Sequence, residues 1–176
     1  MRILGLGTMA LMLALGACHD DVRTGAPVAN GARAVALLHG ADGAAAGQAT
    51  ATEVAGGLRF TIDVKGLPPG THGAHVHTIG TCTPPDFASA GGHWNPTGMK
   101  HGSMNPQGPH EGDLPNLVIG TDGRGAIGIT IPGATMAGLL DGDGSSLVVH
   151  ANRDDMMTDP SGNSGPRIAC GVFAAG

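Results

Sequence analysis

The chain has 176 residues, and 9 Lys and Arg against 14 Asp and Glu give a formal net charge of −5. A net negative chain without clustered Lys and Arg predicts no nucleic-acid partner. It contains 32 glycines and 12 prolines but only one Trp, three Phe and no Tyr, while hydrophobic residues make up 41%. This composition predicts a single domain with many tight turns around a core of small residues, and it argues against a disordered chain.

The first 30 residues have the pattern of a targeting segment. Residues 1–17 carry one early positive charge, at Arg2, followed by an apolar run too short to span a membrane, which predicts a secretory signal peptide. The stretch LGAC at 15–18 resembles a bacterial lipobox, in which Cys18 carries a lipid; the alternative is an ordinary signal with an incidental cysteine. Residues 18–30 then form a lipid-anchored tether. We therefore expect an exported protein of the bacterial periplasm or cell envelope, with a membrane contact only through Cys18.

From residue 31 onward, short β-like runs recur between Gly, Pro, Asn and Asp, and helix patterns are nearly absent. The clearest run, LRFTIDVK at 58–65, alternates apolar and polar side chains as a half-buried strand does. The predicted strands are 33–39, 47–54, 58–65, 73–77, 116–120, 126–131, 146–150 and 168–173. Such a series predicts an all-β domain over residues 31–176, an eight-stranded antiparallel sandwich or barrel.

Two long stretches, 78–114 and 151–166, lack any strand pattern. The first is rich in Pro and Gly, and an irregular loop of that length in a compact domain is usually functional or disordered. Ordering it costs roughly 1–2 kcal/mol of backbone entropy per residue, so something other than a hydrophobic core must hold it. If Cys18 is lipidated, Cys82 and Cys170 remain, and one disulfide is the simplest state in an exported protein. Two buried free thiols are the alternative.

A concentration of potential metal ligands lies between residues 75 and 150. Neutral imidazoles with one carboxylate suit zinc and copper rather than calcium or magnesium. The set is too large for one tetrahedral ion, whereas two neighbouring ions that share one ligand would use every member. Its members are His75, His77, His93, His101, His110, Asp113 and His150.

The spacing of these residues agrees with two clusters. His75 and His77 are two apart in a β-like run, so both side chains point to one face of a strand. His150 ends another predicted strand, and the remaining four candidates lie in or near the glycine-rich loop that could wrap a closed site. Taken singly, most His-x-His pairs bind nothing and each loop histidine is more simply a solvated residue. Their number in one chain is what favours metal binding.

Several separated motifs resemble copper/zinc superoxide dismutases of the bacterial exported type. They are GAHVH (73–77), SAGGHWNP (89–96), KHG (100–102), PHEGDL (109–114), SSLVVH (145–150) and GPRIACGVF (165–173). The resemblance extends from about residue 31 to the end of the chain. It implies an eight-stranded Greek-key sandwich or barrel with two long functional loops.

The resemblance also implies a role for each matched residue. Copper is expected on His75, His77, His93 and His150, and zinc on His93, His101, His110 and Asp113, one ion of each per chain. His93 would bridge the two ions and take part in proton transfer. Asp154 would hydrogen-bond a copper histidine and a zinc histidine, Cys82 and Cys170 would form the disulfide, and Arg167 would receive the substrate anion beside the copper. Without the resemblance, Asp154 would be interpreted as an ordinary loop acid and Arg167 as a surface arginine.

The expected activity is dismutation of superoxide to dioxygen and hydrogen peroxide by a Cu(II)/Cu(I) cycle, with Lys100 and Arg153 as weaker candidates for steering the anion. A non-catalytic copper-binding or carrier domain on the same fold is the main alternative. A structural sandwich with one zinc clip is a third hypothesis, but it leaves His75, His77 and His150 unexplained. Either a monomer or a homodimer is compatible with the sequence.

Overall fold

The computed structural model describes residues 31–176, so the predicted signal segment, the tether and Cys18 lie outside the described residues. The described part contains nine strands and two single-turn helices. In chain order these are β1 (Arg33–Gly40), β2 (Ala45–Val54), β3 (Gly57–Val64), β4 (Gly70–His72), β5 (Ala74–His77), η1 (Ala88–Ala90), β6 (Leu117–Ile119), β7 (Gly125–Pro132), α1 (Met136–Leu139), β8 (Ser146–His150) and β9 (Arg167–Ala175). The all-β prediction is confirmed, and each of the eight predicted runs contains or overlaps a strand.

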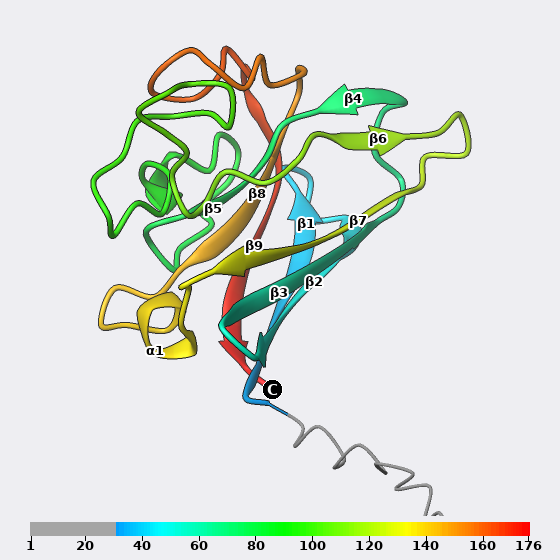
Figure 1. Ribbon diagram of the computed structural model, residues 1–176. Helices are drawn as coiled ribbons and strands as arrows, with labels where there is room; N and C mark the ends of the chain where they lie inside the picture. Colours follow the sequence, from blue (N-terminus) through cyan, green and yellow to red (C-terminus); the bar gives the residue numbers. More distant parts are fainter. Residues whose placement is uncertain (1–30) are drawn as a thin grey trace, which may run out of the picture.

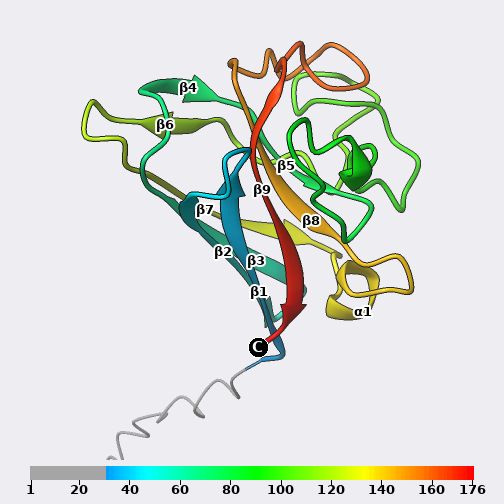
Figure 2. The ribbon, with the colours of Figure 1, turned by 180° about the vertical axis from the view of Figure 1, so that it is seen from behind.

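Seven strands form one curled antiparallel sheet in the order β5-β8-β9-β1-β2-β3-β7, as Figures 1 and 2 show from opposite sides. The chain crosses from one end of this sheet to the other twice, from β3 to the edge strand β5 and from the edge strand β7 to β8, which is the expected Greek-key connectivity. One of the nine strands, β4, was not predicted. It pairs only with β6, in a separate two-stranded sheet, and its sequence GTH has no alternation that would reveal it.

The core is built from small side chains, as the composition predicted. On β1 and β2, Ala34, Ala36, Ala49 and Ala51 are fully buried, which lets these two strands curve closely around the interior. Alternation on β3 directs its apolar side chains inward. Phe60 packs edge-to-face on Phe173 of β9, with ring centroids 6.0 Å apart, so the few aromatics fill the space that alanine leaves.

A second, smaller core lies between the sheet and the first long loop. It contains Phe87, Ala90, Val148 and Cys170, with Cys82 packed against them. The Cys82–Cys170 disulfide joins the loop to β9, which confirms this pairing. The loop is thus fastened to the sheet by a covalent bond and by apolar packing.

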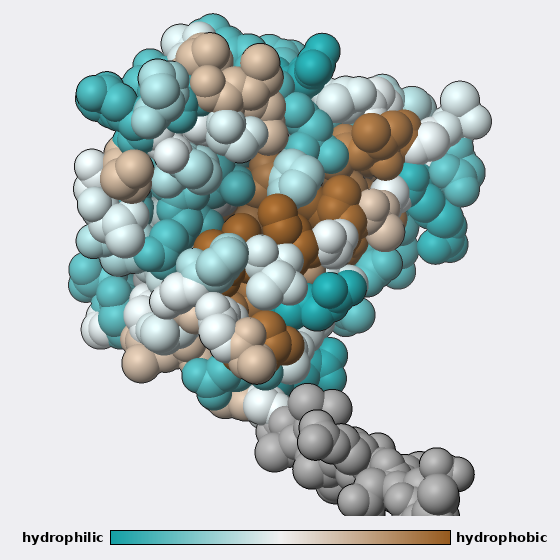
Figure 3. Space-filling model, viewed as in Figure 1, coloured by the Kyte–Doolittle hydropathy of each residue, from teal (hydrophilic) through white to brown (hydrophobic). Residues whose placement is uncertain are grey.

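The two long irregular segments lie together on the side of the sheet formed by β5 and β8 (Figures 1 and 2). Backbone hydrogen bonds link them, for example from Met104 N–H to the carbonyl of Met156 at 2.9 Å. Elsewhere, a hydrophobic band runs along β7 in Figure 3, and Ile127, Ile129 and Ile131 of that strand are only partly buried. Within residues 31–176, no helix has the length and hydrophobicity needed to cross a membrane.

Candidate metal centre

Strand β5 presents two histidines to the loops and two small residues to the core. Ala74 and Val76 belong to the main core, whereas His75 and His77 point to the opposite face, as the spacing of two predicted. The strand is buried along its whole length, between β8 on one side and loop backbone on the other. Both imidazoles are fully buried.

The first long loop runs beside β5 as though it were a further strand. Trp94 N–H donates to the carbonyl of Val76 at 2.8 Å, and Val76 N–H donates to the carbonyl of Gly112 at 2.9 Å. A side chain at Gly112 would place its Cβ only 2.3 Å from the Val76 oxygen, so this close approach requires glycine. The resulting isolated bridges set His93 opposite His77 and Asp113 opposite His75.

Four imidazole nitrogens converge without any hydrogen-bond partner among residues 31–176. They are Nδ1 of His75 and Nε2 of His77, His93 and His150, all of them buried. In this group of four residues, the ligand atoms all lie within 4.8 Å of one another. A buried polar atom without a partner is costly, so four together point to a shared cation. This all-nitrogen set suits copper, and we call it the copper-side cluster.

A second group of ligand atoms surrounds Oδ1 of Asp113. Nδ1 of His93 lies 2.8 Å from this oxygen, and Nδ1 of His101 and of His110 each lie 3.1 Å from it. A carboxylate oxygen offers about two lone-pair sites, so it cannot accept three good hydrogen bonds at once. These separations are close to the edge of about 3.3 Å of a tetrahedron with metal bonds of about 2.0 Å. The set His93, His101, His110 and Asp113 fits zinc, and we call it the zinc-side cluster.

His93 belongs to both clusters through different atoms. Its Nε2 is one of the unpartnered nitrogens of the copper side, and its Nδ1 faces Asp113 on the zinc side. The ring stacks at 4.0 Å, centroid to centroid, on that of His75. The sequence predicted seven residues in two sites with one shared ligand, and the structure brings all seven together in that arrangement.

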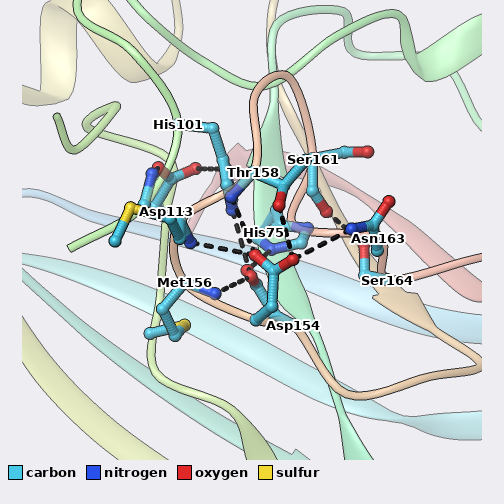
Figure 4. A network of polar contacts seen from close by, with 12 residues as sticks. His75, His101, Asp113, Asp154, Met156, Thr158, Ser161, Asn163 and Ser164 are labelled. Atoms are coloured by element: carbon cyan, nitrogen blue, oxygen red, sulfur yellow. Dashed lines mark hydrogen bonds and ion pairs between the residues drawn. The ribbon is translucent and has the colours of Figure 1, made fainter. Parts of the chain in front are cut away.

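The carboxylate of Asp154 links the two clusters from behind, as Figure 4 shows. Its Oδ2 accepts from His75 Nε2 at 2.7 Å, and its Oδ1 accepts from His101 Nε2 at 3.0 Å. These bonds fix the orientation of both rings and leave Nδ1 of each free for a metal. Carbonyl oxygens do the same elsewhere: Gly91 accepts from Nδ1 of His77 at 2.9 Å and Gly165 from Nδ1 of His150 at 3.0 Å.

Electrostatics differ between the clusters. Burial lowers the pKa of His75 to about 3 and that of His150 to about 4, and it also lowers those of His77 and His93, so these rings are neutral at neutral pH. Burial acts against the charged form of His101 too, but hydrogen bonds to Asp113 and Asp154 outweigh it and raise its pKa to about 9.

Arg167 stands at the opening of the copper side. It faces His150 across the β8–β9 ladder, where a bulge shifts the register, and with His77 and His93 it lines a hollow of about 370 Å³. The half-buried guanidinium donates to the carbonyls of Phe87 at 2.7 Å and Gly91 at 2.6 Å. Burial lowers the pKa of Arg167, but it does so from the high value that is usual for arginine. A fixed cation beside the unpartnered nitrogens can receive a small anion.

The other candidate cations are less well placed. Lys100 pairs with Asp159 at 3.1 Å on the surface, which offsets its charge, while Arg153 is exposed. His72, the last residue of β4, is buried and its ring nitrogens contact the carbonyls of His150 and Pro68, which indicates a structural role.

Sequence reasoning missed the groups that hold the predicted residues in place. The amide of Asn116 makes a reciprocal pair with the backbone of Asp154, with both bonds 2.9 Å long. At Gly162, φ is +62° and a Cβ would overlap the Asp154 carboxylate. Neither residue carries a recognisable signal, because an asparagine and a glycine in loops have many ordinary uses.

Two clusters of metal-ligating side chains that share one imidazole, on a curled antiparallel sheet, define a binuclear metalloprotein of the copper and zinc class. Comparison with known proteins agrees. A family model described as copper/zinc superoxide dismutase (SODC) matches residues 45–173. The chain is 44% identical over 147 residues to the superoxide dismutase [Cu-Zn] of Caulobacter vibrioides, a match that covers 80% of this chain and 84% of that one.

Two further relatives extend the comparison. The extracellular superoxide dismutase [Cu-Zn] of Onchocerca volvulus is 44% identical over 156 residues, covering 82% of this chain and 77% of the relative. The crystal structure of a SOD-like protein from Bacillus subtilis has a TM-score of 0.75 and 39% identity, covering 80% of this chain and 97% of that one. The chain belongs to the copper/zinc superoxide dismutase family and is an oxidoreductase that uses copper and zinc.

Proposed function

We propose that the chain dismutates superoxide with copper held by His75, His77, His93 and His150 and zinc held by His93, His101, His110 and Asp113. The single observation that best supports this proposal is that the two ring nitrogens of His93 belong to two different ligand sets. The overall reaction consumes two superoxide ions and two protons, and it yields one dioxygen and one hydrogen peroxide. Copper supplies a one-electron couple that superoxide can both reduce and reoxidise, whereas zinc has no redox chemistry.

Residues of the chain bind the substrate and move its protons. Arg167 attracts the anion into the hollow beside His77 and His150, which matters because the chain as a whole is negative. Nε2 of His93 takes up a proton and gives it back on the side where the substrate oxygens arrive. Meanwhile Nδ1 of His93 keeps the ring in place on the zinc side. Asp154 holds the rings of His75 and His101 so that both ligand sets keep their orientation.

The non-catalytic carrier alternative is not favoured, because three copper-side residues, His77, His93 and His150, line one open hollow together with Arg167. A direct test measures copper and zinc content together with superoxide consumption in the reconstituted protein, before and after removal of copper alone. We expect activity to be lost when copper is removed and to return when copper is restored. Both metals bound without turnover would contradict the proposal and support the carrier, and zinc without copper would support the structural clip.

We also propose that the protein is exported and that Cys18 carries a lipid. The Cys82–Cys170 disulfide supports an oxidising compartment, and the relative from Onchocerca volvulus is named as extracellular. Residues 1–17 would be removed and 18–30 would tether the domain of residues 31–176. Mass spectrometry of the cell-derived protein should find a lipid-modified Cys18 as its first residue. A mature chain that begins elsewhere would exclude the anchor, and size-exclusion chromatography with light scattering would decide between monomer and homodimer.

A further inference from the structure

The guanidinium of Arg167 is held entirely by one short segment of the first long loop, residues 87–91. Nη1 donates to the carbonyl of Phe87 and Nη2 to that of Gly91. Among the hydrogen bonds of residues 31–176, none joins Arg167 to a carboxylate, although the charge of Asp86 acts on it from a greater distance. The position of the substrate-facing cation therefore depends on what fixes the backbone of this segment, which we call the acceptor segment.

The disulfide reaches the acceptor segment only through Thr83, which accepts from Phe87 N–H at 3.0 Å and donates its own N–H to Ser89 Oγ at 2.7 Å. Cys82 lies five residues before Phe87, and the intervening Thr83, Pro84, Pro85 and Asp86 are exposed. Within the acceptor segment, the deeply buried side chains are those of Phe87, which is 2% exposed, and Ala90. The ring of Phe87 packs with Val148 of β8 and Cys170 of β9 in the small second core. Through it the acceptor segment contacts the two strands that carry His150 and Arg167.

The backbone of Phe87 adds an independent observation. Its φ of 54° and ψ of 24° lie in the left-handed region, where a side chain with a Cβ is disfavoured and glycine is usual. A large aromatic at such a position indicates that the ring is needed there. The same backbone conformation turns the Phe87 carbonyl so that it accepts from both Arg167 and Ala90 N–H, the latter at 3.1 Å.

We infer that Phe87 is a positioning residue for substrate binding: its buried ring holds the carbonyl that aims the Arg167 guanidinium at the copper-side hollow. This inference rests on the proposed role of Arg167. Gly91 has no side chain with which to anchor itself, and its carbonyl also accepts from the copper ligand His77. Loss of the Phe87 ring would therefore release the guanidinium and disturb the charge that meets superoxide, while leaving the metal ligands in place.

The test compares Phe87→Ala and the milder Phe87→Leu with Phe173→Ala and Phe173→Leu, which remove a comparably buried ring from the main core. All are measured as metal-loaded proteins beside Arg167→Ala. Two readouts are used: kcat/KM for superoxide as a function of ionic strength, and the rate at which phenylglyoxal modifies Arg167, followed by peptide mass spectrometry. The exposed Arg153 serves as the internal reference for the modification rate.

We expect Phe87→Ala to lower kcat/KM roughly tenfold to a hundredfold, because misplacing a binding group by about an ångström can cost about a hundredfold. Modification of Arg167 should become several times faster, with unchanged metal content. Phe87→Leu should show both effects more weakly, and the Phe173 variants neither. If Arg167→Ala is slow but the Phe87 variants match wild type in both readouts, the inference is wrong while the proposed function stands. If Arg167→Ala itself is as active as wild type, the proposed role of Arg167 fails instead.

Discussion

The two halves of the metal centre are built in different ways. Copper-side donors other than His93 stand on strands, His75 and His77 on β5 and His150 at the end of β8, and the ladder between these strands sets their spacing. The zinc-side donors all lie in the first long loop, where isolated bridges join His93 and Asp113 to β5 but no ladder of a regular strand carries the set. A strand site is preorganised by backbone hydrogen bonds, whereas a loop site depends on the ion that it encloses. We therefore expect the copper side to control catalysis and the zinc side to control stability.

The largest expected effect is loss of catalysis from a strand donor. His77→Ala removes one unpartnered nitrogen and should abolish superoxide consumption, yet it leaves the β5–β8 ladder intact. In the zinc-only protein the unfolding midpoint of this variant should therefore stay close to that of wild type. Activity assays with and without added copper, and thermal unfolding of the zinc-only forms, measure the two effects. A collapse of the zinc-only midpoint would show that the strand site is not independent of the loop.

The converse change is made in the loop. Asp113→Ala removes the carboxylate around which the zinc-side histidines gather and which also accepts from the N–H groups of Gly102 and His110. Zinc affinity should fall by more than the roughly 10–100-fold that loss of an outer hydrogen-bond partner costs. The first long loop should then become accessible to proteases while β5 stays protected from hydrogen exchange. Glu111→Ala, two residues away and not among the clustered ligands, is the matched control. Equal opening of loop and strand would remove the distinction.

The pH dependence of the stability of the metal-free protein should distinguish the two clusters further. His75 and His150 have folded pKa values of about 3 and 4, below the usual 6.5, so the unfolded state binds more protons and stability falls as pH drops below about 6.5. His101 has the opposite sign. Its pKa of about 9 in the folded state contributes stability that is complete below about 6.5 and is lost as pH rises through 9.

The acid loss should reach the order of several kcal/mol, since each unit of pKa shift corresponds to about 1.4 kcal/mol and several histidines contribute. Urea unfolding of the metal-free protein between pH 4 and 10 gives the profile, with a maximum near pH 6.5. His101→Gln should flatten the alkaline arm. An alkaline arm that survives in this variant would assign it to another group.

The strand half of this site is far easier to predict from sequence than the loop half. Alternation in residues 58–65 and the spacing of His75 and His77 translate directly into geometry, because a strand has a fixed period of two. The loop has no period, so the sequence groups His101, His110 and Asp113 only as members of one glycine-rich loop that could wrap a closed site, and their individual roles as zinc ligands are implied by the resemblance. Phe87 and Asn116 could not be predicted, since their roles depend on contacts with Arg167 and Asp154, which are 80 and 38 positions away. Gly162 could not be predicted because nothing in its loop sequence indicates that a Cβ there would overlap the Asp154 carboxylate. The short strand β4 was missed for the same reason.

A substitution at the link between the halves should have a more moderate effect on both. Asp154→Asn keeps the size of the side chain, but an amide can accept from only one of His75 and His101 through its oxygen while its NH2 group opposes the other ring. We expect copper and zinc affinities each to fall by roughly 10–100-fold, the usual cost of a lost outer partner.

Competition titrations with a chromophoric chelator measure both affinities of the Asp154→Asn protein. Asp155→Asn is the matched control, because the neighbouring carboxylate accepts only from the turn at Thr158, Met157 and Asn163 and touches no metal ligand. If zinc binding alone weakens, the carboxylate supports only the loop half, and the two clusters are joined by His93 and by nothing else that this experiment can detect.

The smallest expected effect concerns the surface contact between the two loops. Lys100 Nζ lies 3.1 Å from Oδ2 of Asp159, and both side chains are exposed, so the pair should contribute only about 0.2–1 kcal/mol. The more important contact is made by the other carboxylate oxygen, which accepts from the backbone N–H of His101 at 2.9 Å. Lys100→Gln should therefore shift the unfolding midpoint slightly and only at low salt, whereas Asp159→Ala should also weaken zinc binding, because it removes the acceptor for the backbone N–H of a ligand. Lys65→Gln, directly after β3, controls for the change in net charge. A larger effect from Lys100→Gln than from Asp159→Ala would mean that charge, and not the hydrogen bond to the ligand's backbone, couples the second loop to the zinc side.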